Sequence, residues 1–176
     1  MTLQPATLAD LLDRAAITEL VNGYAYGIDR RDWALYRSIF ADRLEVDLAW
    51  SGIVETMGVD RWVATVAQML APFDATHHRM TNVSIDLDGN RATLFAQMVA
   101  RHMLEIDGVQ HMHRIGGHYT HHVVREAGGW RITRLGLIIT WEEGDRGLFD
   151  RAAARGPRPR ADVGTQGMRY EAAGPA

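Results

Sequence analysis

The sequence Asn22-Gly-Tyr24-Ala-Tyr26-Gly-Ile28-Asp29-Arg-Arg-Asp32-Trp33 ends one helical pattern, starts another, and places a carboxylate where an apolar helix face stops. An acid near a helix C-terminus, at the edge of a buried face, is disfavoured both by desolvation and by the helix dipole. Asp29 therefore needs a cation or a hydrogen-bond donor. The sequence offers two: a solvated pair with Arg30 or Arg31, or a buried histidine from elsewhere in the chain.

The residues before this stretch, together with Tyr24 and Ile28 within it, are predicted to form one face of an amphipathic helix. Their apolar side chains recur at spacings of three and four, which is the helical period. Thr7 and Asp10 resemble a capping box at its start. The predicted apolar face consists of Leu11, Leu12, Ala15, Leu20, Val21, Tyr24 and Ile28.

Composition removes several classes of chemistry. With 176 residues, the chain has the length of one domain with a substantial core. It has no cysteine, and all 19 basic residues are arginine, so thiolate catalysis, Schiff-base catalysis and a P-loop lysine are excluded. A net charge of −3, without a basic stripe, argues against nucleic acid as a partner. The chain has neither a membrane-length apolar run nor a signal pattern, so we expect no membrane partner and a cytoplasmic location.

The order of the remaining patterns predicts an α+β fold. Asp32 is a plausible N-cap for a second helix over 32–41, and a third helix is expected over 59–70. Strands are expected over 44–48, 75–86, 91–106, 115–125 and 130–141. Three helices followed by antiparallel strands predict a strongly curved sheet wrapped round the helices, in a domain spanning residues 1–150. Residues 151–176, rich in Arg, Gly, Pro and Ala, are expected to form a tail, flexible or packed on a neighbouring subunit.

The most informative histidine is one of an adjacent pair. Period-two alternation places His78, Met80, Asn82 and Ser84 on one strand face and His77 on the other, so only one of the two histidines can face the interior. A carboxylate that bonds one imidazole nitrogen orients the ring and makes it a better base. Asp29 with His78 would form such a dyad. The competing interpretation is a surface or structurally satisfied histidine.

Other candidates are less specific. His102 continues the apolar face of the strand over 91–106 and could line a cavity. His111 and His113 have the i, i+2 spacing of many metal pairs, but no acid follows at a suitable distance and His111 is expected near a turn, so no metal is predicted. Alternation places Arg134 on one face with Trp130 and Ile132. There it either offers a fixed charge to an anion or pairs with a surface acid. The sequence does not decide which of His102, His113, His118, His121 and His122 face the interior.

Several spaced motifs together resemble the SnoaL-like branch of the nuclear transport factor fold, with its cone-shaped barrel. The residues that carry the resemblance are Ala15-Ala-Ile-Thr-Glu-Leu-Val-Asn-Gly-Tyr24, Asp29-Arg-Arg-Asp-Trp33, Thr76-His-His78, Thr81-Asn82, Gly117-His-Tyr119, Gly129-Trp-Arg-Ile132 and Arg134. The pattern is most similar to bile acid 7α-dehydratase and hexachlorocyclohexane dehydrochlorinase. Their paired Asp and His fall on Asp29 and His78. Tyr24 falls where the dehydratase has tyrosine and the dehydrochlorinase has lysine, which favours a dehydratase.

The resemblance implies a cofactor-independent lyase acting on a hydrophobic, cyclic or aromatic, hydroxylated substrate. His78, oriented by Asp29, would remove a proton from carbon, and Tyr24 would assist the departing oxygen, with Arg134 or His102 stabilising the anion. Loss of water or retro-aldol loss of a small carbonyl compound would use the same groups. The alternatives are a polyketide cyclase or isomerase and a non-catalytic module that binds a hydrophobic ligand. A homodimer or homotrimer is expected by resemblance. The expected substrate-lining residues are Val21, Trp50, Leu94, Met98, His102 and Tyr119.

Overall fold

A computed structural model describes residues 7–48 and 51–157 of the chain. The helices are α1 (Leu8–Asp29), α2 (Trp33–Ser38), α3 (Val59–Leu70) and α4 (Leu148–Arg155). The strands are β1 (Phe40–Leu48), β2 (Ile53–Gly58), β3 (Ala75–Asp88), β4 (Arg91–Ile106), β5 (Val109–Glu126) and β6 (Gly129–Gly144). This order confirms the predicted α+β class.

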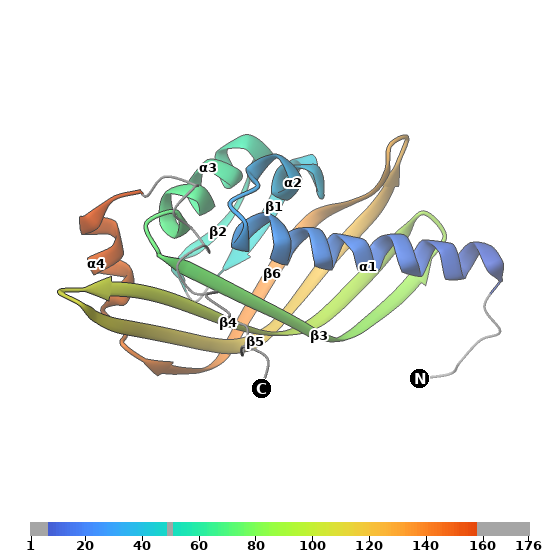
Figure 1. Ribbon diagram of the computed structural model, residues 1–176. Coiled ribbons are helices and arrows are strands. Elements are labelled where there is room, and N and C mark those ends of the chain that lie inside the picture. Colours follow the sequence, from blue (N-terminus) through green and yellow to red (C-terminus); the bar gives the residue numbers. More distant parts are fainter. Residues whose placement is uncertain (1–6, 49–50, 158–176) are drawn as a thin grey trace, which may run out of the picture.

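The six strands form one mixed sheet in the order β2-β1-β6-β5-β4-β3. All neighbours are antiparallel except β1 and β6, which run parallel. Figure 1 shows the long strands β3 to β6 curling on one side of α1, with α2 and α3 near one end of that helix. The sheet is curled but not closed, because β2 and β3 remain its edges. The core therefore lies between the inner face of the sheet and the first three helices.

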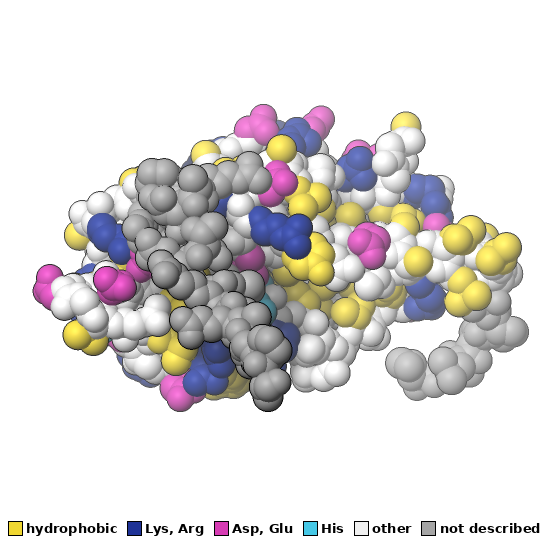
Figure 2. Space-filling model, in the orientation of Figure 1, with side chains coloured by type: hydrophobic (Ala, Val, Ile, Leu, Met, Phe, Trp, Pro, Cys, Tyr) yellow, Lys and Arg dark blue, Asp and Glu magenta, His cyan; other side chains and the backbone are white. Residues whose placement is uncertain are grey.

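The first helix begins as predicted, but its first turns are not buried. Thr7 and Asp10 form the complete capping box. The buried face starts at Ile17, whereas Leu11 and Leu12, predicted to belong to it, are exposed. Figure 1 shows these turns of α1 projecting past the strands, and Figure 2 shows hydrophobic side chains gathered at that end. The helical period was predicted correctly, but the sheet does not reach far enough to cover the first part of the apolar face of α1.

The second helix is shorter than the sequence pattern predicts. Asp32 is its N-cap and accepts a hydrogen bond from the Leu35 backbone, as expected. The helix ends at Ser38, and Phe40 already pairs with Ile132 of β6. The Ile39 carbonyl accepts a hydrogen bond from the Ile132 backbone. Strand pairing therefore takes two apolar residues that helical periodicity had assigned to α2.

Two irregularities change which side chains face the core. In β3 the register shifts between Thr81 and Ser84, with Asn82 at a φ of 51°, so Ser84 is exposed and Ile85 turns inward instead. Between β5 and β6, Val123 pairs with Ile132 but His122 pairs with Arg134, which leaves Thr133 as an extra residue. Such a bulge reverses the alternation of every residue beyond it. The prediction that Ile132 and Arg134 share a face is therefore wrong.

A fourth helix, not predicted from the sequence, follows the sheet. α4 crosses the expected boundary at residue 150, and its Leu148 and Ala152 are fully buried. Arg155 fastens it through an ion pair with Asp74, with a shortest distance of 3.1 Å, and a hydrogen bond to the Pro72 carbonyl. Residues 158–176 of the expected tail lie outside the described residues. No helix in the described part of the chain is long and apolar enough to cross a membrane.

Candidate active site

Two glycines allow the helix that carries Asp29 to pack closely against α2 and the residue after it. A Cβ on Gly27 would lie 2.7 Å from Cβ of Tyr36, and one on Gly23 would lie 2.7 Å from Cγ2 of Ile39. Beyond the helix, Arg31 adopts a φ of 56°, a left-handed conformation that reverses the chain before α2 begins. This close packing and sharp turn fix the C-terminal end of α1, and with it the carboxylate of Asp29.

Asp29 and His78 form the predicted dyad. Nδ1 of His78 lies 2.7 Å from Oδ1 of Asp29. The backbone N–H of His78 donates to Oδ2 at 2.7 Å, so the same residue holds both carboxylate oxygens. The His78 side chain is buried, and the neighbouring His77 is exposed, as strand alternation predicted. Among the described residues no hydrogen bond occupies Nε2 of His78, so this nitrogen is available for a further contact.

Thr76 and Arg31 support Asp29 through buried hydrogen bonds that the sequence patterns do not predict. The Thr76 hydroxyl donates to Oδ1 of Asp29 at 3.0 Å and accepts from Nη1 of Arg31 at 2.7 Å. Arg31 is buried, and its Nη1 also donates to the Ile28 carbonyl at 2.6 Å. Burial lowers the pKa of Arg31 to about 10, an effect that the charge of Asp29 partly offsets. The arginine therefore acts on Asp29 through a threonine, and not as the solvated partner considered for Arg30 or Arg31.

Tyr24 lies beside the dyad in a cluster of buried aromatic residues. Its ring centroid is 6.3 Å from that of His78, and its hydroxyl is 2.9 Å from the hydroxyl of Tyr119. Burial is the main cause that raises the pKa of both tyrosines well above the usual value. Each phenol therefore keeps its proton and can donate a hydrogen bond. Tyr24 and Tyr119, both predicted as site residues, are thus brought together.

The structure decides which histidines face the interior. His102, His113 and His121 are buried on the inner face, whereas His118 and His122 lie on the outer face of β5. Burial, followed by nearby positive groups, lowers the pKa of His102 and of His121 to about 3. Both rings are therefore neutral near pH 7. The ring centroid of His102 lies 6.0 Å from that of His78, so it can offer a neutral polar group to the same space.

A second histidine and carboxylate pair lies further along β5. Nε2 of His113 is 3.4 Å from Oε2 of Glu142, and Nδ1 of His111 is 3.3 Å from Asp145. His111 is the third residue of β5 and therefore lies close to the turn at Asp107-Gly108, as expected. The ring of Phe149, from α4, packs against both His102 and His113. Helix α4 therefore covers this end of the inner face.

Arg134 pairs with surface acids, the second of the two alternatives that the sequence left open. Its guanidinium lies 2.9 Å from Glu45 and 2.6 Å from Asp47, both on the outward face of β1. The extra residue Thr133 turns it away from the buried Ile132. Its expected contribution to anion stabilisation is therefore not supported by its position.

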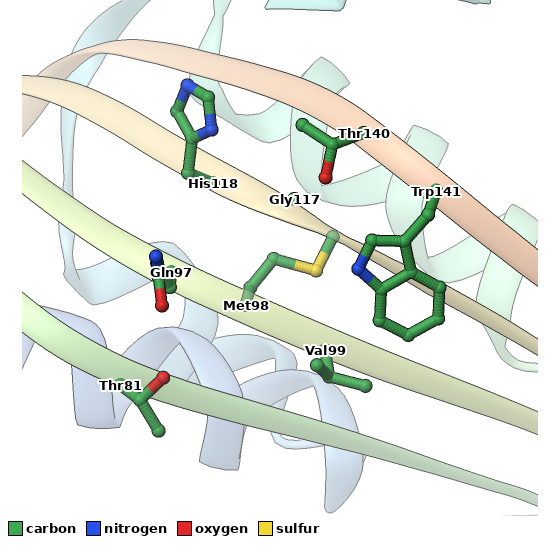
Figure 3. A pocket seen from close by; sticks show the side chains of 8 residues that line it. All are labelled: Thr81, Gln97, Met98, Val99, Gly117, His118, Thr140 and Trp141. Atoms are coloured by element: carbon green, nitrogen blue, oxygen red, sulfur yellow. The ribbon is translucent and has the colours of Figure 1, made fainter.

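The expected apolar lining is buried on the inner side of the sheet. Val21, Leu94 and Met98 all belong to the hydrophobic core, and Trp50 lies outside the described residues. A pocket of about 250 Å³ opens on the outer face, where Figure 3 shows the helices behind the strands and His118 and Trp141 at its rim. Another, of about 350 Å³, lies near Asp86 and His122. Neither is lined by Asp29 or His78, so neither bears on the dyad.

The curled mixed sheet with helices packed on one side is the architecture of a known structural class, the cystatin-like or nuclear transport factor-like cone fold. A protein of this fold from Nostoc punctiforme aligns with a TM-score of 0.57 at 19% identity, covering 77% of this chain and 95% of its own. More particularly, the family model described as a SnoaL-like domain matches residues 9–136, so the chain belongs to this family.

Other solved structures are more similar. The Kfla4162 protein from Kribbella flavida is 30% identical, with a TM-score of 0.73, and the match covers 80% of this chain and 98% of that one. A hexachlorocyclohexane dehydrochlorinase (LinA) of type 2 is 23% identical, with a TM-score of 0.69 and coverage of 81% and 95%. At that identity the likeness shows the fold alone. No curated protein matches the chain at a significant level.

Proposed function

We propose that this protein is a cofactor-independent lyase that eliminates water from a hydrophobic, cyclic, hydroxylated substrate. The observation that carries the proposal is the Asp29–His78 pair, in which the carboxylate meets Nδ1 at 2.7 Å and the backbone N–H of the same histidine at 2.7 Å. A base held in this way needs no reorganisation before it takes a proton. A structural neighbour of the chain, the hexachlorocyclohexane dehydrochlorinase, is named for an elimination.

The proposed reaction balances without a cofactor. Nε2 of His78 takes a proton from carbon, and the electron pair of that C–H bond forms a double bond to the neighbouring carbon. The C–O bond at that neighbour breaks, and the departing oxygen receives a proton from Tyr24 and leaves as water. The proton on His78 then returns to Tyr24 through solvent. Tyr119, within hydrogen-bond distance of Tyr24, orients the donor. Retro-aldol loss of a small carbonyl compound would use the same base.

The inner face supplies the apolar part of the site. Val21, Leu94 and Met98 belong to the same hydrophobic core as Tyr24 and Tyr119, and apolar residues of this kind favour a hydrophobic ring system over a sugar or a nucleotide. His102, neutral because burial lowers its pKa to about 3, can donate a hydrogen bond to an oxygen that becomes negative in the reaction. Of the two residues considered for stabilising the anion, Arg134 and His102, we therefore assign the role to His102.

The test is a substrate screen with matched histidine variants. Hydroxylated and halogenated cyclic compounds are incubated with the full chain, and loss of water or acid is followed by mass spectrometry. H78A is expected to lower turnover by about 10²–10⁴-fold, the usual contribution of a general base. H77A, which removes an exposed imidazole one residue away, is expected to match the wild type. An H78A variant that keeps its turnover would overturn the assignment of the base. Binding without any turnover would favour the ligand-binding module instead.

A further inference from the structure

Arg31 is a buried cation whose position is costly unless it has a specific task. Only 4% of its surface is exposed, and Nε and Nη2 have no hydrogen-bond partner among the described residues. Leaving buried N–H groups unpaired destabilises a fold, and apolar residues often replace buried charges without loss. These nitrogens are also out of reach of solvent, so they offer no open site to a ligand. The function of Arg31 must therefore come from the one nitrogen that is engaged.

That nitrogen, Nη1, starts a chain of hydrogen bonds that ends at the proposed base. Nη1 donates to Oγ1 of Thr76 at 2.7 Å, and Thr76 donates to Oδ1 of Asp29 at 3.0 Å. The same oxygen lies 2.7 Å from Nδ1 of His78. A guanidinium has donors and no acceptor, so the threonine oxygen must accept from Arg31 and its single proton is free to point at Asp29. The direction of the whole chain is thus set at its arginine end.

The protonation state of Asp29 decides which nitrogen of His78 carries its proton. An ionised carboxylate only accepts, so Nδ1 must be the protonated nitrogen, and Nε2 keeps a lone pair. A protonated carboxyl would donate to Nδ1 instead, and the proton of the neutral ring would move to Nε2. Each carboxylate oxygen of Asp29 already faces a donor, the Thr76 hydroxyl at Oδ1 and the His78 backbone N–H at Oδ2, and an ionised carboxylate accepts from both. Arg31 fixes the first of these bonds, because its own donation obliges the Thr76 hydroxyl to donate to Asp29.

We infer that Arg31 is a positioning residue that acts through Thr76 and Asp29 to hold His78 in the tautomer with an unprotonated Nε2. This inference rests on the proposed function, because the tautomer matters only if His78 is the base. It assigns Arg31 no contact with the substrate. From a left-handed backbone conformation, the side chain of Arg31 reaches both the Ile28 carbonyl and Thr76.

The test reads the tautomer directly and needs no substrate. In the full chain with ¹⁵N-labelled histidine at pH 7, the two ring nitrogens of His78 are expected to give widely separated signals, with the proton on Nδ1. In R31M and in T76V these signals are expected to move toward each other, because the two tautomers then interconvert. T76S keeps the hydroxyl and is expected to restore the wild-type separation. Val has the shape of Thr and favours strands, so T76V tests the chain of bonds even if R31M does not fold.

The matched control is R30M, which removes an exposed arginine one residue away. Arg30 lies over the ring of Tyr26, at 4.6 Å from its centroid, and its loss is expected to leave the His78 signals unchanged. Wild-type signals in both R31M and T76V would overturn the inference, and H78A could still abolish turnover. Conversely, R31M and T76V could shift the signals while the substrate screen finds no elimination. In that case the inference stands and the proposed function fails, so the two failures can be told apart.

Discussion

Two of the histidine and carboxylate pairs, Asp29–His78 and His113–Glu142, differ in how firmly the acid is held. In the Asp29–His78 pair the carboxylate has three hydrogen-bond contacts, all within 3.0 Å and all with residues of β3. In the His113–Glu142 pair the distance is 3.4 Å, and the other oxygen of Glu142 faces Arg146 on the surface. The first carboxylate is held by a strand, whereas the closest contact of the second is with a largely exposed arginine.

The difference shows what makes such a pair chemically useful. Proximity of an acid to a histidine is common, but it leaves the imidazole free to change orientation. At Asp29 a backbone N–H and a threonine hydroxyl fix the acid before it meets the ring. A preorganised acceptor lowers the cost of placing positive charge on the imidazole during the reaction. Glu142 has neither support among its recorded hydrogen bonds.

The largest expected effect compares isosteric changes in the two acids. D29N keeps the shape of the side chain but removes its charge, and is expected to lower turnover of an identified substrate by about 10²–10⁴-fold. E142Q is expected to leave turnover within about twofold of the wild type, since Glu142 is partly exposed and lies outside the proposed dyad. Steady-state kinetics of both variants checks this. Equal losses in D29N and E142Q would remove the distinction between the two pairs.

A buried histidine that has no carboxylate partner among the described residues, His121, is expected to make the stability of the fold depend on pH. Burial lowers the pKa of His121 to about 3, so between pH 6.5 and pH 3 the unfolded chain binds more protons than the folded one, and the free energy of unfolding decreases as the pH is lowered. At pH 5 the penalty from His121 is about 2 kcal/mol. Denaturant unfolding at pH 7 and pH 5 is expected to show that H121Q loses less stability than the wild type by this amount. H122Q, which changes the exposed neighbour, should follow the wild type; a wild-type slope in H121Q as well would contradict the assignment.

A smaller effect is expected where the hydroxyl of Tyr119 meets that of Tyr24. Y119F removes the 2.9 Å hydrogen bond between two buried phenols and is expected to lower the free energy of unfolding by about 1 kcal/mol. Y26F serves as the control, because it alters an exposed tyrosine on α1, the helix that carries Tyr24. Urea unfolding measures both. No loss in Y119F would mean that Tyr24 finds another partner and is not oriented by Tyr119.

The smallest expected effect is the change in the free energy of unfolding caused by removing the charge of Glu142. E142Q is expected to change the free energy of unfolding by less than about 0.5 kcal/mol, because Glu142 is partly exposed and Arg146 is largely exposed. Urea unfolding at low and at high salt should give the same small value. A loss above about 1 kcal/mol would show that Glu142 is held as firmly as a buried acid.

Two local periods placed the members of the pair, and the family resemblance suggested that they meet. Helical period put Asp29 at the edge of a buried face, and strand alternation put His78 and His77 on opposite faces of their strand. Neither period reveals an extra residue in a strand. Thr133 is such a residue, and it moved Arg134 from the predicted inner face to the outer one. Likewise, the strand pairing of Phe40 with Ile132 shortened α2 against its own helical pattern.

By itself, the sequence determined the α+β class, the capped start of α1, the absence of thiol and lysine chemistry, and the side of β3 on which His78 lies. These follow from composition and from periods of two and 3.6 residues, which are properties of neighbouring residues. Only the tertiary structure decided the link from Arg31 through Thr76 to Asp29, the meeting of Tyr24 with Tyr119, and the outward position of Arg134. These depend on strand register, on a bulge and on one left-handed turn, which bring together residues far apart in the chain.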